Sequence, residues 1–191
     1  MTAKPQRADA RDNRARILAA ADEVFGAGGA AASTEDVAKL AGVGIATVFR
    51  HFPTKVDLLT AVLTDRLERL ATQARDLLDA DDADDAGAAF FGFFTDVVET
   101  ATTKVTIAEA LVDAGAAPED GPEPVARAGR DLRRAFADLL ARAQAAGAVR
   151  ADVESPEVYA LMVGTSRAVV HTHLPPSVKD RLLALAFDAL R

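Results

Sequence analysis

Hydrophobic positions recur at helical spacing along nearly the whole chain. The first apolar stripe comprises Ile17, Ala20, Ala21, Val24 and Phe25. Residues three or four apart share one face of an α-helix, and glycine commonly ends a helix. The pattern therefore predicts a first helix that ends near Gly28 and Gly29. The polar residues before it, 1–12, are expected to form a flexible basic arm.

Two short helices and one long helix follow in the pattern. Ser33 and Asp36 have the spacing of a capping box, and a short helix is expected from there to Gly42. A second short helix runs from Ile45 to His51 and ends at Phe52–Pro53, because the residue before a proline avoids helical geometry. Thr54 is positioned to cap a long fourth helix that continues to about residue 78.

The rest of the chain predicts further helices and no strand. The acidic run over residues 79–85 is interpreted as a solvated loop rather than a cation site, because it lacks the spacing of a calcium loop. Helices are expected from residue 87, with a break near Thr102 and Thr103, then over 105–114, 124–146, 156–170 and 178–190, with a loop over 115–124. The prediction is an all-α fold of about nine helices.

Composition and charge narrow the class of protein. The chain has 191 residues, no cysteine and a net charge of -7. Residues 1–55 carry eight Lys/Arg and six Asp/Glu, a balance of +2, which leaves -9 for the remainder. This uneven distribution of charge favours binding of a polyanion by the N-terminal part of the chain. The N-terminus lacks the apolar segment of a signal peptide, and no run approaches a membrane span of about 20 apolar residues, so a cytoplasmic protein is expected.

Residues 33–51 have the spacing of a helix-turn-helix. Small residues are needed where the two helices cross and at the turn, and Ala38 and Gly42 meet those needs. The residues expected to pack the two helices on the first helix are Val37, Leu40, Val43 and Val48. The residues expected on the outside, where a major groove is accessible to them, are Gly44, Ile45, Ala46, Thr47, Arg50 and His51.

The stretch STEDVAKLAGVGIATVFRHFPTKVDL, residues 33–58, resembles the DNA-binding segment of the TetR family of regulators. The matching positions are Ser33, Val37, Ala38, Ala41, Gly42, Val43, Phe49, Phe52 and Lys55. The resemblance implies a DNA-binding domain over residues 1–55 and a helical ligand-binding and dimerisation domain over residues 56–191. Gly44 and Phe49 stand where the family often has serine and tyrosine.

The resemblance also implies roles for residues of the first domain. Ser33 and Lys55, at the starts of two helices, are expected to hold DNA phosphates. Phe49 and His51 are expected at the DNA backbone. Thr47 and Arg50 are the candidates for base-edge or nearby phosphate contacts, since an arginine can donate to both O6 and N7 of guanine.

The last two predicted helices are apolar nearly all round, which favours a partner subunit. The resemblance implies the same arrangement, in which these helices pair with their copies in a homodimer. The candidate interface residues are Val163, Val170, Leu182, Ala186 and Leu190. Helix-turn-helix dimers read two half-sites about 34–36 Å apart, so the expected partner is a palindromic double-stranded operator.

A small-molecule effector is the second expected partner. Phe90 and Phe94 are interpreted as core residues, whereas Phe93 lies off their stripe. The candidate ligand-binding residues are Phe93, Leu111, Phe136, Leu140, Tyr159, Met162, Ser166 and Arg167. For Arg167, anchoring an acidic ligand and a salt bridge across the dimer are both open.

These observations predict a ligand-responsive regulator, most simply a repressor released from DNA by its effector. The alternative is a helix-turn-helix regulator with no effector, controlled by its abundance or by a protein partner. No catalytic set is evident, so an enzyme is not expected, and no cofactor is implied. His171 and His173 are two residues apart and share no helix face, so no metal site is expected.

Overall fold

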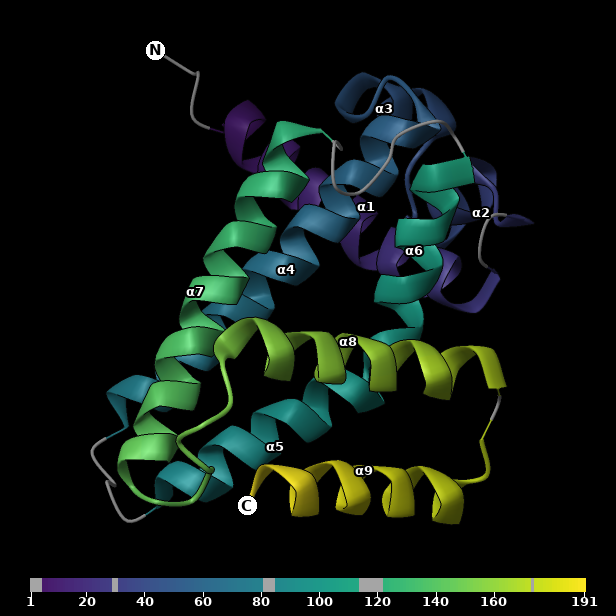
Figure 1. Ribbon diagram of the computed structural model, residues 1–191. Helices are drawn as coiled ribbons and strands as arrows, with labels where there is room; N and C mark the ends of the chain where they lie inside the picture. Colours follow the sequence, from purple (N-terminus) through teal and green to yellow (C-terminus); the bar gives the residue numbers. More distant parts are fainter. Residues whose placement is uncertain (1–4, 29–30, 81–84, 114–121, 173) are drawn as a thin grey trace. The chain divides into compact units, whose positions relative to one another are not determined.

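The computed structural model describes residues 5–28, 31–80, 85–113, 122–172 and 174–191 (Figure 1). Over these residues the chain forms nine helices and no strand, which confirms the predicted all-α class. The helices are α1 (Pro5–Gly28), α2 (Thr34–Ala41), α3 (Ile45–His51), α4 (Lys55–Asp79), α5 (Ala86–Glu99), α6 (Ala101–Asp113), α7 (Glu123–Ala145), α8 (Ser155–Thr172) and α9 (Pro176–Leu190).

Three predicted boundaries were wrong. Helix α1 begins at Pro5, so the expected flexible arm over 1–12 is helical from that residue onward. The break between α5 and α6 falls at Thr100, where the backbone N–H and the hydroxyl both bond to the Asp96 carbonyl, rather than at Thr102–Thr103. Helix α8 includes Ser155, which was expected to precede it. Residues 81–84 of the acidic run, the loop over 115–121 and His173 lie outside the described residues.

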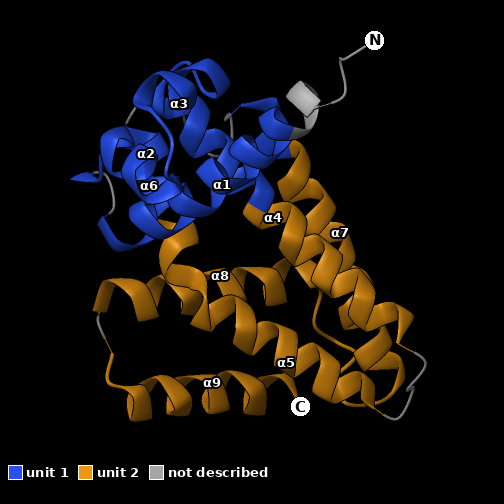
Figure 2. Ribbon diagram, turned by 180° about the vertical axis from the view of Figure 1, so that it is seen from behind, with its two compact units in different colours: residues 1–65, 106–126 blue, residues 66–105, 127–191 orange. Residues whose placement is uncertain are grey.

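The described chain falls into two compact units (Figure 2). Unit 1 comprises Met1–Asp65 and Thr106–Ala126, and unit 2 comprises Arg66–Val105 and Arg127–Arg191. The boundary inside α4 lies between Asp65 and Arg66, whereas the sequence placed it after Lys55. None of the helices in the described ranges has the length and apolar character needed to cross a membrane.

Unit 1 packs its short helices on a common apolar core. Ile17, Phe25, Val37 and Val48 are fully buried, as their spacing predicts. The expectation that Leu40 helps to pack these helices was wrong, because its side chain is 49% exposed. The buried face of α2 instead follows the i, i+3, i+4, i+7 series from Thr34 to Ala41, and Leu40 lies off that series.

Unit 2 is organised around α5, which lies between α8 and α9 (Figure 1). Phe91 and Phe94 of α5 contact the ring of Phe187 on α9, with centroids 4.7 and 5.3 Å apart. Phe90 and Phe93 face the other way and contact Phe136 of α7. Two pairs of phenylalanines on α5, each pair three residues apart, thus join α5, α7 and α9 into a single core.

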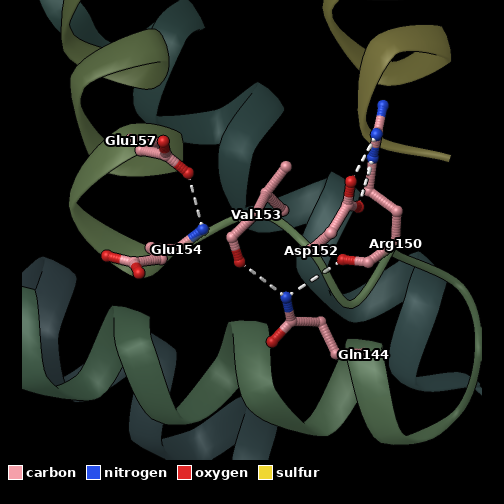
Figure 3. Close-up of polar contacts among 6 residues, drawn as sticks. All are labelled: Gln144, Arg150, Asp152, Val153, Glu154 and Glu157. Carbon is pink, nitrogen blue, oxygen red and sulfur yellow. Dashed lines mark hydrogen bonds and ion pairs between the residues drawn. The ribbon is translucent and has the colours of Figure 1, made fainter.

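The connection from α7 to α8 is fixed by polar contacts (Figure 3). Gly147 ends α7 with φ of 72°, as predicted. The Gln144 amide then donates to the carbonyls of Arg150 and Val153, each at 3.0 Å. The Glu157 carboxylate accepts from the Glu154 N–H at 2.7 Å and so covers the start of α8. The ordered connection sets where α8 begins.

Candidate nucleic-acid interface and effector-binding unit

Helix α2 begins with a side-chain cap. The Ser33 hydroxyl oxygen accepts from the Asp36 N–H at 3.1 Å, and the same hydroxyl donates to the Asp36 carboxylate at 2.7 Å. The predicted cap is therefore present, although the Asp36 side chain bonds to the Ser33 hydroxyl rather than to a backbone N–H. Satisfying an orphan N–H in this way stabilises a helix of only eight residues.

The turn between α2 and α3 is a Schellman motif. Gly42 has φ of 63°, its N–H donates to the Lys39 carbonyl at 3.2 Å, and the Val43 N–H donates to the Ala38 carbonyl at 3.0 Å. The Arg16 guanidinium of α1 also donates to the carbonyls of Ala41 and Gly42. This cation at the C-terminal end of α2 fixes the direction in which the chain enters α3.

Replacing Gly42 with alanine is expected to lower the free energy of unfolding by about 1–2 kcal/mol, because φ of 63° is costly for a residue with a Cβ. The added Cβ would also lie 2.9 Å from the Arg16 guanidinium. The control is Gly44→Ser, where φ is -71° and nothing lies within 4 Å. A serine there adds a cap, and a gain of about 0.5 kcal/mol is expected. Urea denaturation at one protein concentration measures both, and a loss at neither or both positions contradicts the assignment.

Helix α3 presents almost its whole surface outward. Val48 is its buried residue, whereas Ala46, Phe49 and Arg50 are exposed. Ile45, Thr47 and His51 are half-buried at its margins, and Gly44 is exposed just before it. The structure therefore brings the predicted residues from Gly44 to His51 together on one short helix. Its end is closed by Phe52, which is buried and lies 5.1 Å beneath the Arg14 guanidinium.

Lys55 has a different position from the one expected of a phosphate contact. Its ammonium donates to the Ala32 carbonyl at 2.8 Å and lies 5.5 Å from the centre of the Phe25 ring. These contacts join the start of α4 to the segment before α2. The capping box of α4 forms as predicted: the Thr54 hydroxyl accepts from the Asp57 N–H, and the Asp57 carboxylate accepts from the Thr54 N–H and from the Thr54 hydroxyl.

Sequence reasoning missed the bracing roles of Arg14, Arg16 and Lys55. All three are cations near the helix-turn-helix, where a contact with DNA is the simplest expectation. Their partners are carbonyl groups and two aromatic rings far away in sequence. No local spacing indicates such partners, because they are set by how α1 and α4 pack on the motif.

The predicted ligand-binding residues are divided between the two units. Leu111 belongs to unit 1, whereas the other seven belong to unit 2. Phe136, Leu140 and Met162 are fully buried, and the Ser166 hydroxyl donates to the Met162 carbonyl of its own helix at 2.9 Å. Tyr159 packs on Phe136, with ring centroids 5.6 Å apart, and burial raises the pKa of its hydroxyl.

Unit 2 contains a pocket of about 290 Å³ between α4, α5 and α7. Phe93 is the predicted ligand residue that lines it. The other lining residues are Gln73, Leu77, Ala80, Asp85, Ala88, Ala89, Gly92, Asp96 and Arg142. The Gln73 amide donates to the Asp96 carboxylate at 2.8 Å, and Arg142 donates to the carbonyls of Leu77, Leu78 and Ala80. The pocket is thus bordered by polar groups that already have partners.

The candidate residues for the dimer interface differ in how far their side chains are buried within the subunit. Ala186 and Leu190 are buried inside their own subunit, so their side chains are unavailable to a partner. Val163, Val170 and Leu182 are half-buried. The exposed apolar side chains of α8 and α9 are instead Leu161, Val178 and Leu185, the last of them 57% exposed. The sequence pattern of these two helices did not separate their inner faces from their outer faces.

The capped α2, the glycine turn and the exposed α3 define a helix-turn-helix transcriptional regulator. Comparison with known proteins supports this class. Residues 17–62 match the family described as bacterial regulatory proteins, tetR family, and residues 85–191 match that described as transcriptional regulator SbtR-like, C-terminal domain. The chain therefore belongs to the TetR family of transcriptional regulators.

Solved structures agree over nearly the full length. A TetR regulatory protein from Mycobacterium vanbaalenii is 37% identical, with a TM-score of 0.77, over 98% of this chain and 99% of that one. The regulator SCO0520 from Streptomyces coelicolor is 30% identical, with a TM-score of 0.75, over 93% and 98%. The HTH-type transcriptional regulator SAR0097 from Staphylococcus aureus is 29% identical over 77 residues, which is 39% of this chain and 40% of that protein. These relatives are regulators, not enzymes.

Proposed function

We propose that this regulator is a repressor that binds a palindromic operator as a homodimer and is released by a small molecule. The observation that carries the DNA-binding part is the outward surface of α3, where Val48 is buried and the neighbouring side chains are exposed or half-buried. A seven-residue helix with small and polar outer residues fits a major groove.

The proposed contacts follow from this surface. Arg50 and Thr47 read base edges or hold nearby phosphates, and Gly44, Ile45 and Ala46 allow close approach of the backbone to DNA. Phe49, which is 43% exposed, and His51 pack on the sugar-phosphate chain. Ser33 places the N-terminal end of α2 toward a phosphate. Lys55 acts as a brace that positions α4, not as a phosphate contact.

Replacing Arg50 with alanine is expected to weaken operator binding by about 10- to 100-fold, because an arginine–base contact contributes about 1–3 kcal/mol. The operator is first selected from a random pool of duplexes, and affinity is then measured by fluorescence anisotropy at one salt concentration. Arg134→Ala is the matched control, since Arg134 is an exposed arginine of α7 in unit 2. Equal affinity of the two variants would remove Arg50 from the interface.

A homodimer is expected in sedimentation experiments at nanomolar concentration. The exposed apolar side chains of Leu161 and Leu185, on two adjacent helices, support this because burying them removes apolar area from water. Replacing both with glutamate is expected to give a folded monomer and to abolish two-fold symmetry in the selected duplexes. A folded wild-type monomer at nanomolar concentration would overturn the dimer.

The effector part of the proposal rests on the space in unit 2. A pocket of about 290 Å³ is close to the lower limit for small-molecule sites, and the aromatic ring of Phe93 lines it. A ligand acts by binding more tightly to the conformation whose recognition helices do not match the half-sites. A regulator without an effector is the alternative, and the absence of any ligand that releases DNA would favour it.

A further inference from the structure

The N-terminal half of α1 carries a cationic side chain that the protein itself does not use. Helix α1 begins at Pro5, so Arg11, which the sequence placed in a flexible arm, is held on a helix. Arg11 is exposed, and within the described part of the chain its guanidinium makes no hydrogen bond, ion pair or ring contact. A helix fixes the direction in which such a side chain projects, which a flexible arm does not.

Arg14 relates this side chain to α3. Arg11 and Arg14 are three residues apart and therefore share one side of α1. The Arg14 guanidinium lies 5.1 Å from the centre of the Phe52 ring, and Phe52 directly follows His51, the last residue of α3. Both ribbon views show the N-terminal half of α1 and helix α3 at the same end of unit 1 (Figure 1 and Figure 2). The side of α1 that bears Arg11 thus continues from the end of the proposed recognition helix.

The acidic residues of this part of α1 lie on its other side. An α-helix turns by about 100° per residue, so two residues that are two positions apart project about 160° apart. Asp9 and Asp12 precede Arg11 and Arg14 by two positions each, and both acids are exposed. The side of α1 nearest the end of α3 is therefore positive, as a surface that binds a polyanion requires.

We propose that Arg11 binds a DNA phosphate beside the groove that α3 enters, and that Arg14 positions α1 for this contact by packing on Phe52. The inference rests on the proposed DNA binding and extends the interface from α3 to α1. A single exposed ion pair is weak by itself, so the partner is a polyanion that α3 already holds in place rather than a free anion. Phosphate contacts fix the register of a protein on the duplex without reading its sequence.

The test replaces Arg11 with glutamine, which removes the charge and keeps a similar helix propensity. Affinities for the selected operator and for a duplex of scrambled sequence are measured by fluorescence anisotropy at several salt concentrations. Each phosphate contact contributes about 0.9 to the slope of log K against log salt concentration. We expect Arg11→Gln to lower this slope by about 1 per subunit. We also expect it to weaken binding of both duplexes by the same factor, about 3- to 10-fold per subunit.

Matched variants separate a phosphate contact from a general change of charge. Arg75→Gln removes an equal charge from an exposed position of α4 in unit 2, and it is expected to keep the wild-type slope. Arg11→Lys keeps the charge and is expected to keep most of the slope. Arg11→Gln should retain the urea midpoint of the wild type, because no partner within the protein is lost. Equal slopes for Arg11→Gln and Arg75→Gln, or a loss at Arg11 confined to the operator, overturn the phosphate contact.

The two duplexes also separate this inference from the proposed function. A wild-type protein that prefers the operator, with a slope that does not depend on Arg11, would retain operator recognition and overturn the contact from α1. A wild-type protein that binds both duplexes equally, with a slope that falls in Arg11→Gln, would retain the phosphate contact and overturn operator recognition.

Discussion

Replacing Phe136 with alanine is expected to lower the free energy of unfolding by about 3–5 kcal/mol, which is the range for deleting a buried aromatic ring. Phe136 is fully buried on α7 and is the ring on which three others meet. Its centroid lies 5.8 Å from that of Phe90, 6.4 Å from that of Phe93 and 5.6 Å from that of Tyr159. Removing it would leave a cavity among α5, α7 and α8 that rigid neighbours cannot fill.

The size of this loss separates two roles for Phe136. A ring that lines an open ligand cavity is solvated on one side, so its removal costs much less than that of a packed core ring. Urea denaturation with circular dichroism measures the change. Phe49→Ala is the control, because Phe49 is exposed on α3, and a change within about 0.5 kcal/mol is expected. A loss below about 1 kcal/mol at Phe136 would return it to the ligand-binding residues.

The helix-turn-helix was predictable because its determinants are local. The capping spacing of Ser33 and Asp36 and the turn glycine at Gly42 specify where α2 begins and ends. A buried residue then follows at Val48, one helical turn into α3. Each of these features depends on residues within about five positions of one another, so a single sequence contains the information. The exposed face of α3 followed from the same spacing.

The contacts made over long sequence separations were not predictable in the same way. Lys55 and Arg16 bond to carbonyls 23 and more residues away, which no periodicity indicates. On α9, Ala186 and Leu190 face the core of their own unit, whereas Leu185 faces outward. A helix that is apolar all round gives no signal for which face meets the subunit and which meets a partner. The inner and outer faces of α9 are distinguished only by its packing against α5 and α8.

The free energy of unfolding is expected to rise between pH 8 and pH 10.5 because of Lys104. Burial, and then the charges of Arg66 and Arg167, lower the pKa of this group from its usual 10.5 to about 8 in the folded chain, so the unfolded chain binds the proton more tightly in this window. Below pH 8 both states are protonated, and the folded state carries the full cost. The separation of the two values corresponds to at most about 3 kcal/mol. As the pH rises above 8 the folded lysine loses its charge, and the cost then falls steadily until it is gone above pH 10.5.

Lys104→Met isolates this contribution from other groups that titrate in the same window. The variant is expected to be more stable than the wild type by up to about 3 kcal/mol below pH 8, and the difference should vanish above pH 10.5. Lys179→Met has the opposite sign, because the bond to Glu99 raises the pKa of Lys179 and its charge stabilises the fold. Urea midpoints at pH 7, 9 and 10.5 give the three curves. A Lys104→Met variant that is less stable than the wild type at pH 7 would mean that the lysine charge is already compensated within the protein.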